Sequence, residues 1–309
     1  MTDVLKSRDA LMHSIRAFFH AEGFDEVETP LVLKTPCMEL HIDAIPSGDG
    51  FFRTSPELSH KKLLAQGAEK IFEIGPCFRQ GEKGRLHNPE YTMLEWYRIH
   101  SDYNTALADT QRLIDPLLAG SPMSWPSATE DCRAGTEPPQ IPSSGGVPEG
   151  RGGFSKPWKI FSVEEVFEKF AGWNPVEEFD ADRFDLDLIE KVEPALPKDS
   201  PVVLKDYPAE LCALARLKPD NPKVAERWEL YLGGIEIANA YSELTDPVEQ
   251  RARFERWGEQ RRALGKEVYP IDEEFIQALE TMPPASGVAL GVDRLLMTLT
   301  GAKHIAEVL

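Results

Sequence analysis

The feature that most constrains the fold is one segment, residues 71–98, in which two aromatic and apolar arms flank a glycine-rich, charged middle. This composition predicts two β-strands joined by a long loop. Side chains alternate across a strand, so each arm has one face whose members can be counted. On the second arm that face carries Tyr91, Met93, Glu95 and Tyr97, and on the first arm it carries Glu73, Gly75, Cys77 and Arg79.

Burying charged side chains on a sheet face is costly unless they have partners or ligands. One interpretation is an internal salt bridge between Arg79 and Glu95. The other is a pocket floor, where Arg79 neutralises an anion and Glu95 receives a cation. The loop between the arms adds Glu82, Lys83, Arg85 and His87. A basic loop over a sheet favours binding of a nucleotide triphosphate, but the same residues are also typical of an ordinary solvated turn.

A second group of polar residues lies in the segment 228–244, which predicts two strands around a turn at Gly233 and Gly234. Counting along the second strand puts Asn239, Tyr241 and Glu243 on one face and Glu236 on the opposite face. The face of Glu229, before the turn, is not fixed by counting. Two carboxylates near a phosphate site, Glu229 and Glu236, favour magnesium; the alternative is surface acids in an acid-rich protein.

Two shorter segments add candidate residues. GVALGVDR, residues 287–294, predicts a buried strand leading into a helix near Asp293, whose N-terminal end favours anions and carries Arg294. An Asp293–Arg294 ion pair at the surface is the alternative. In TSPE, residues 54–57, Ser55 is a candidate helix cap. Glu57 is then either a binding residue or a simple helix-start carboxylate.

The remaining patterns predict further helices and an extended segment. One helical face carries Leu11, Ile15, Phe18 and Phe19, with a stop at Gly23 and an extended segment ending at Pro30. Residues 120–153 are rich in glycine and proline and predict a flexible insertion. Residues 161–227 predict mostly helix with proline breaks, and residues 247–264 predict a charged helix.

Composition excludes several classes of function. The chain of 309 residues carries 52 acidic and 34 basic side chains, a net charge of −18, which disfavours nonspecific binding to nucleic acids and anionic membranes. Its four cysteines form no CxxC pair and predict reduced thiols. No signal peptide opens the chain, and no run approaches the roughly 20 apolar residues of a membrane span. We therefore expect a cytoplasmic protein that does not enter a membrane.

Taken together, these segments resemble the catalytic core of class II aminoacyl-tRNA synthetases. FRQGEKGRLHNPEYTMLEWYR is similar to the second motif of that class, GVALGVDRLLM to the third, and the helix with the strand ending at Pro30 to the first. GGIEIANAYSEL resembles the lysine-recognition strand of lysyl-tRNA synthetases. SPELSHKKLL, RLHNPEYTMLEWYR and SGVALGVDR are more similar to the elongation factor P–lysine ligase family.

This resemblance implies an α+β fold, an antiparallel sheet flanked by helices, formed by one catalytic domain over residues 1–309. It also implies a homodimer through the first motif, and no anticodon-binding domain, since the core helix begins within the first ten residues. It implies the use of ATP and Mg²⁺ to activate (R)-β-lysine, or lysine, as an adenylate. The activated amino acid is then transferred to a lysine side chain of elongation factor P.

The resemblance also implies roles for individual residues. Arg79 and Arg294 are the catalytic pair, on the α- and γ-phosphates; Arg79 also holds the substrate carboxylate. The ATP site further includes Glu82, His87, Asn88, Tyr91 (stacked on adenine), Glu229 and Gly291. Glu57 binds the amine near the carboxylate, Asn239 holds the carboxylate end, and Glu95, Tyr97 and Glu243 surround the distal ammonium. Tyr241 and Ala289 complete the substrate site, and Glu229 and Glu236 hold magnesium.

The chain departs from the family pattern at one place and from lysyl-tRNA synthetases at another. It has FRQGE where relatives have FRNE, which makes Glu82 the nearest carboxylate to read adenine. Ala289 stands where lysyl-tRNA synthetases have glycine. Its methyl group narrows the pocket beside the α-carbon, which favours a β-amino acid.

Two other functions remain as alternatives. A truncated lysyl-tRNA synthetase would transfer labelled lysine to tRNA; the net charge argues against tRNA as the acceptor. A non-catalytic paralogue would bind a partner without catalysis, but such relatives lose the motif arginines, and this chain retains both Arg79 and Arg294.

Overall fold

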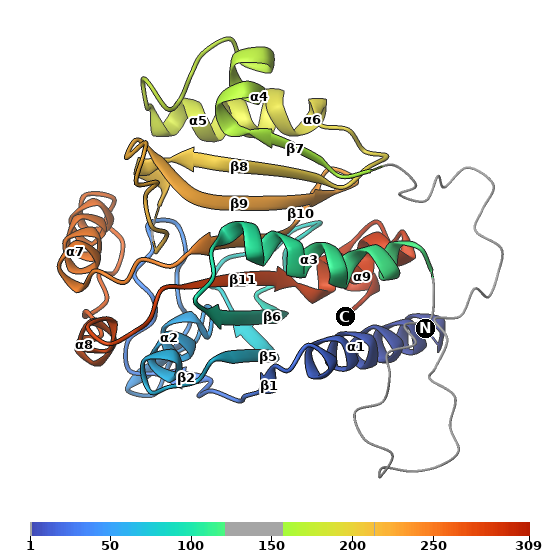
Figure 1. Ribbon diagram of the computed structural model, residues 1–309, viewed down its shortest axis with the longest axis horizontal. Coiled ribbons are helices and arrows are strands. Elements are labelled where there is room, and N and C mark those ends of the chain that lie inside the picture. Colours follow the sequence, from blue (N-terminus) through green and yellow to red (C-terminus); the bar gives the residue numbers. More distant parts are fainter. Residues whose placement is uncertain (1, 121–156, 213) are drawn as a thin grey trace.

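The computed structural model describes residues 2–120, 157–212 and 214–309, so the predicted insertion at 120–153 lies almost entirely outside the described residues. Its centre is an eight-stranded sheet in the order β1-β5-β6-β11-β10-β9-β8-β7 (Figure 1). These strands are β1 (Asp25–Glu26), β5 (Lys70–Phe78), β6 (Glu90–Ile99), β7 (Lys159–Ser162), β8 (Val202–Pro208), β9 (Val224–Leu232), β10 (Ile235–Ser242) and β11 (Ala285–Gly291).

The predicted antiparallel sheet is confirmed for the six strands from β5 to β8. The outer strands β1 and β7 pair in parallel with β5 and β8, which makes the whole sheet mixed. A separate small sheet joins β2 (Val32–Leu33), β3 (Pro46–Ser47) and β4 (Gly50–Phe52).

Helices cover both faces of the large sheet and one end of it (Figure 1). The α-helices are α1 (Thr2–Ala21), α2 (Glu57–Ala65), α3 (Tyr103–Leu118), α4 (Val163–Phe170), α5 (Ala181–Asp187), α6 (Glu193–Ala195), α7 (Pro247–Ala263), α8 (Glu273–Leu279) and α9 (Val292–Thr300). Short turns of other helix types are η1 (Leu188–Val192), η2 (Ala209–Leu211) and η3 (Ile305–Glu307). Among the described residues, no helix combines the length and the apolar character that crossing a bilayer requires.

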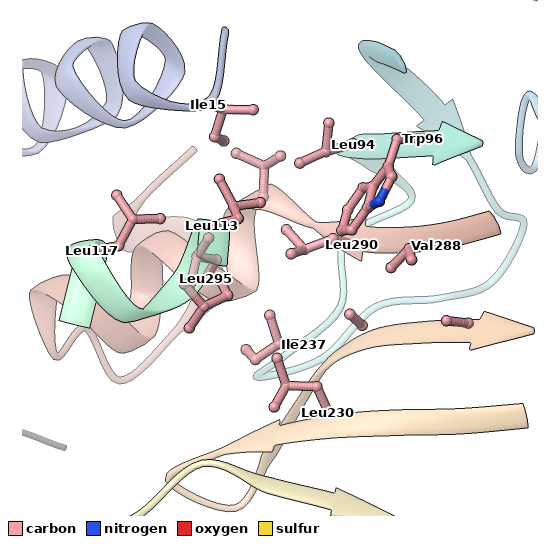
Figure 2. Packing of buried hydrophobic residues seen from close by; sticks show 14 of the residues in the cluster. Ile15, Leu94, Trp96, Leu113, Leu117, Leu230, Ile237, Val288, Leu290 and Leu295 are labelled. Atoms are coloured by element: carbon pink, nitrogen blue, oxygen red, sulfur yellow. The ribbon is translucent and has the colours of Figure 1, made fainter. Parts of the chain in front are cut away.

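Alternation along the strands separates an apolar face from a polar one. Leu94 and Trp96 of β6, Val288 and Leu290 of β11 and Leu230 of β9 are buried against α1, α3 and α9 (Figure 2). The predicted apolar face of α1 packs into the same cluster. Fully burying one such large apolar side chain stabilises the fold by about 1.5–3 kcal/mol. This cluster anchors the strands whose intervening residues face the other way.

One sequence prediction of secondary structure is wrong. Residues 161–227 are not mostly helical, because they include β8 and the start of β9. The β8 segment is a short apolar run that begins at Val202 after Pro201, and periodicity alone cannot assign such a run. Its position between β7 and β9, with both faces largely covered, decides its conformation. The predicted reduced thiols are confirmed for Cys37, Cys77 and Cys212, all free and buried; Cys132 lies outside the described residues.

Candidate active site

The polar face of the sheet forms the floor of a cavity of about 330 Å³. The cavity is lined by strands β6, β9, β10 and β11 of this sheet, by the N-terminal end of α2 and by the β5–β6 loop. Most of the predicted site residues line it together: Glu57, Arg79, Glu82, His87, Asn88, Tyr91, Glu95, Glu229, Glu236, Asn239, Tyr241, Ala289, Gly291 and Arg294. Tyr97 and Glu243 are buried as well: the Tyr97 hydroxyl donates to Glu95, and Glu243 contacts Lys61.

At one end of the cavity Arg79 lies over an aromatic ring. Its guanidinium carbon is 5.2 Å from the centroid of the Tyr91 ring, a cation–π contact, and Nη1 is 3.5 Å from Oε1 of Glu82. The Tyr91 hydroxyl donates to the carbonyl of Thr54 at 2.7 Å, which fixes the ring. Among the described residues no salt bridge joins Arg79 to Glu95, so the internal ion-pair interpretation is not realised.

Arg294 enters the cavity from the first turn of α9. Nη1 is 3.0 Å from Oε2 of Glu236, and Nη2 donates to Nε2 of His87 at 2.7 Å. Burial, and then the charge of Arg294, lower the pKa of His87, which favours the neutral imidazole that accepts this hydrogen bond. Asp293 pairs with Arg8 at 2.7 Å instead. The alternative of an Asp293–Arg294 ion pair is therefore not realised.

The prediction that Glu236 faces away from Asn239 and Tyr241 is wrong. A register shift between Glu236 and Ala238 places one extra residue in β10 opposite β9. A bulge of this kind reverses the alternation of side chains on either side of it. Glu236 therefore lines the same cavity as Asn239 and Tyr241, and counting from the sequence could not locate this irregularity.

Glu229 and Glu236 are neighbouring carboxylates that line the cavity. Burial, and then the neighbouring charge of Glu229, raise the pKa of Glu236, as expected for two close carboxylates. The described residues contain no cluster of three or more acidic, histidine or cysteine ligands. Magnesium is commonly held by one or two carboxylates together with substrate phosphates and water, so this pair fits that ion.

Glu229 is held in place by hydrogen bonds that sequence reasoning missed. Oε1 accepts from Nη2 of Arg227 at 2.6 Å. Oε2 accepts from the hydroxyls of Tyr207 and Tyr231 at 2.6 and 2.7 Å. Arg227, Glu229 and Tyr231 alternate along β9, so a count from a known strand boundary would have put them on one face.

The other end of the cavity is acidic. Glu95 is fully buried, and its two oxygens accept hydrogen bonds from Ser55 at 2.6 Å and Tyr97 at 2.8 Å. Burial, and then the nearby carboxylate of Glu57, raise the pKa of Glu95 to about 8. A cation that enters the cavity would stabilise the ionised form of this carboxylate.

Lys61, which sequence reasoning did not select, lies between two of the predicted substrate-binding acids. Its Nζ is 2.7 Å from Oε1 of Glu57, one turn earlier in α2, and 2.5 Å from Oε2 of Glu243. The Lys61 side chain is fully buried. Glu57 is the first residue of α2, as the helix-start interpretation predicted, and it also lines the cavity.

A second buried network lies beside Glu95 on the same face of the sheet. Glu73 is directly opposite Glu95 in the sheet and contacts Arg53 at 2.5 Å, His60 at 2.8 Å and the Thr29 hydroxyl at 2.7 Å. Burial alone would raise the pKa of Glu73, but these partners outweigh it and lower the pKa to about 2. The two facing carboxylates therefore have opposite electrostatic environments.

Two small residues of β11 shape the acidic end. Ala289 is paired with Glu95 on one side and with Asn239 on the other, so its methyl group lies between two predicted substrate contacts. A Cβ atom at Gly287 would come within 2.2 Å of the Tyr97 ring and 2.5 Å of Glu243. Glycine at this position allows both side chains to lie against the strand.

Comparisons with known proteins agree with this geometry. Residues 1–309 match the family described as tRNA synthetases class II (D, K and N), which confirms the predicted α+β class of fold. Relatives named elongation factor P–(R)-β-lysine ligase come from Vibrio parahaemolyticus, at 36% identity over 98% of this chain and 94% of the relative. Others come from Hamiltonella defensa, at 35% over 100% and 94%, and Erwinia tasmaniensis, at 36% over 99% and 93%. Within the class II synthetases, the chain belongs to the family of these ligases.

Proposed function

We propose that this protein uses ATP to activate (R)-β-lysine as an adenylate and transfers it to a lysine side chain of elongation factor P. The observation that carries the proposal is one cavity lined by Arg79 and Arg294 and also by the buried carboxylates of Glu57 and Glu95. The basic end suits a triphosphate, and the acidic end suits the two ammonium groups of a diamino acid. The names of the relatives supply the specific amino acid and acceptor.

In the first step, a carboxylate oxygen of the amino acid attacks the α-phosphorus, and the bond to pyrophosphate breaks. Arg79, which adjoins the adenine-stacking position at Tyr91, neutralises charge on the α-phosphate and holds the carboxylate. Arg294 and the neutral His87 bind the outer phosphates, and Asn88 and Gly291 line the nucleotide region. Fixed donors placed where negative charge develops lower the barrier without a protein nucleophile.

Glu229 and Glu236 would hold Mg²⁺, which when bound supplies positive charge to the phosphates. Arg227 and the two tyrosines around Glu229 keep that carboxylate oriented. Glu82, whose Oε1 is 3.5 Å from Nη1 of Arg79, would read adenine.

At the acidic end, Glu57 binds the amine nearer the carboxylate and Glu95, held by Tyr97, binds the distal ammonium. Asn239 and Tyr241 line the carboxylate side, and Glu243 completes the acidic set. In the second step, a neutral lysine amine of the acceptor attacks the activated carbonyl. An amide bond forms, AMP leaves, and the amine loses one proton.

We also propose that the protein works as a cytoplasmic homodimer. Leu31 and Val32 follow Pro30 in the segment that resembles the first motif, and their exposed fractions are 39% and 46%. Exposed apolar side chains here suit a partner subunit.

The transfer reaction tests the proposal directly. Purified protein is incubated with ATP, Mg²⁺ and labelled β-lysine or lysine, and with either elongation factor P or tRNA as acceptor. We expect label on elongation factor P, with β-lysine preferred. Label on tRNA alone, or pyrophosphate exchange that runs as well with leucine, would overturn the proposal.

A further inference from the structure

One carboxylate of the cavity, Glu39, has no part in adenylate formation. Glu39 is half-buried, lies between β2 and β3, and lines the cavity together with Arg79 and Glu57. Of the charged side chains around it, these two act most strongly on its carboxyl group. In the proposed function Arg79 holds the substrate carboxylate and Glu57 binds the amine nearest to it. Glu39 therefore belongs to the part of the cavity in which the activated carboxyl group is held.

The Glu39 carboxylate is also unpaired. Over residues 2–120, 157–212 and 214–309, it forms no hydrogen bond and no salt bridge, and the nearby Arg227 is engaged by Glu229 and Asn239. A half-buried carboxylate without a partner is free to bind a cationic group that enters the cavity. Every other carboxylate that lines the cavity has a partner: Glu57 has Lys61, Glu82 has Arg79, Glu95 has Ser55 and Tyr97, Glu229 has Arg227, Glu236 has Arg294 and Asp293 has Arg8.

A buried arginine of α7 fixes the backbone that carries Glu39. Nη1 of Arg261 donates to the carbonyls of Glu39 at 2.7 Å and of Ile42 at 2.9 Å, and Nη2 donates to the carboxylate of Asp43 at 2.7 Å. Arg261 is fully buried, and its planar guanidinium presents these donors in a fixed geometry. The segment is therefore held through its main chain, which leaves the Glu39 side chain available in a defined position.

We propose that Glu39 is the general base of the transfer step, which receives the ammonium group of the acceptor lysine and removes one proton from it. The proposal rests on the proposed function and deepens it. A lysine side chain is protonated at neutral pH, so its nitrogen must lose a proton before it can attack. Among the cavity carboxylates of the described residues, Glu39 alone has no internal partner that competes for the incoming ammonium.

The transfer step then proceeds without any further reactant. One proton moves from the acceptor ammonium to the Glu39 carboxylate, and the neutral nitrogen attacks the carbonyl carbon of the adenylate. A C–N bond forms, and the C–O bond to the phosphate breaks as AMP leaves with the electron pair. A second proton passes from the attacking nitrogen to a phosphate oxygen of AMP, so the net charge is unchanged by the transfer. Glu39 loses its proton to water before the next cycle.

The electrostatic environment of Glu39 suits proton transfer near neutral pH. Burial raises the pKa of Glu39 to about 7, although the charge of Arg79 opposes this rise. Glu57 and Glu82 raise the pKa further, and Arg227 lowers it. A carboxylate with a raised pKa is a stronger base than an ordinary one, and general bases work best when their pKa is close to the working pH.

A single-turnover chase tests the proposal. The enzyme is first loaded with ATP and β-lysine, so that the adenylate is already formed, and either elongation factor P or hydroxylamine is then added. Hydroxylamine is largely uncharged at neutral pH, so no proton has to be removed before it attacks. The proteins compared are the parent, Glu39→Gln and, as a matched control, Glu69→Gln, which removes an exposed carboxylate outside the cavity.

The measured quantity is the rate of transfer to elongation factor P divided by the rate of transfer to hydroxylamine. In Glu39→Gln this ratio should fall at least about 100-fold, the contribution of a general base, whereas Glu69→Gln should keep the ratio of the parent. A parent-like ratio in Glu39→Gln would overturn the proposal. An equal loss of rate with both acceptors would also overturn it, because Glu39 would then act on the adenylate and not on the acceptor.

The pH profile of the same chase gives an independent answer, even if the variant does not fold. In the parent, transfer to elongation factor P should rise with pH as Glu39 ionises and level off above about 7. In Glu39→Gln it should keep rising toward the ordinary lysine pKa of about 10. A parent profile that rises without a break to the lysine pKa would contradict the proposal. A parent that transfers β-lysine to hydroxylamine but never to elongation factor P would instead overturn the proposed function.

Discussion

The two carboxylates that face each other across β5 and β6 predict opposite effects of the same substitution. Glu95 is buried on the cavity floor, with hydroxyl groups as its hydrogen-bond donors. Glu73 is buried beside Arg53. Changing Glu95 to Gln keeps its shape, and the hydroxyls of Ser55 and Tyr97 can each donate or accept. Glu95→Gln therefore removes a charge with little change in packing.

We expect Glu95→Gln to lose activity and gain stability. Loss of one charge-assisted contact costs about 1.5–3 kcal/mol, or about 10- to 150-fold in kcat/KM for the diamino acid. Because the pKa of Glu95 is raised to about 8 in the folded protein, the folded state binds the extra proton. Stability therefore falls as the pH rises from the ordinary carboxyl pKa through about 8, by at most about 5 kcal/mol. Because glutamine does not ionise, Glu95→Gln avoids this loss of stability at higher pH.

Glu73→Gln is the matched control. The pKa of Glu73 is lowered to about 2, so its contribution to stability is present above the ordinary carboxyl pKa and is lost as the pH falls through about 2. Removing its charge leaves Arg53 buried without its carboxylate, and should cost about 3–5 kcal/mol.

The assays are denaturant unfolding at pH 8 and pyrophosphate exchange as a function of β-lysine concentration. Glu95→Gln should unfold at higher denaturant concentration than the parent, and Glu73→Gln at lower. If Glu95→Gln is less stable than the parent, or retains its kcat/KM for β-lysine, then Glu95 is not a buried carboxylate that binds a substrate ammonium.

Further predictions concern the remaining parts of the cavity. Ala289→Gly should improve the use of α-lysine relative to β-lysine by about tenfold, the effect of roughly one methyl group; an unchanged ratio would refute the role of that methyl. Arg294→Ala should lower pyrophosphate exchange by at least about 100-fold with an unchanged circular dichroism spectrum, and near-parent exchange would count against it. Glu236→Gln should raise the Mg²⁺ concentration needed for half-maximal exchange, whereas an unaltered requirement would place the ion elsewhere. The KM for β-lysine should fall as the pH rises through about 8 and Glu95 ionises, and the same pH profile in Glu95→Gln would contradict this cause.

The sequence predicts those parts of the fold in which side chains alternate regularly along a strand. The hairpin of β5 and β6 and the passage from β11 into α9 follow from alternation and from glycine positions. The face of Tyr91, Met93 and Glu95 follows in the same way. The regular pattern fails at β10, where a bulge rotates Glu236 into the cavity.

Other residues could not be found from the sequence because their roles depend on contacts between distant elements. Lys61 is one of two lysines at the end of SPELSHKK, and only the packing of α2 against Glu243 shows which one is buried. Arg53 and Glu73 likewise form a pair that is visible only when the sheet is assembled. The strand β8 is short and apolar, and its neighbours decide its conformation.

In the proposed function, the cavity joins a triphosphate and a diamino acid for transfer to a protein lysine. Intact-mass spectrometry of elongation factor P, after incubation with this protein, ATP and β-lysine, measures this directly. We predict a mass gain of one β-lysyl group on a single lysine, absent with Arg294→Ala. Unmodified elongation factor P, under conditions in which the same preparation charges tRNA, would contradict the proposed function.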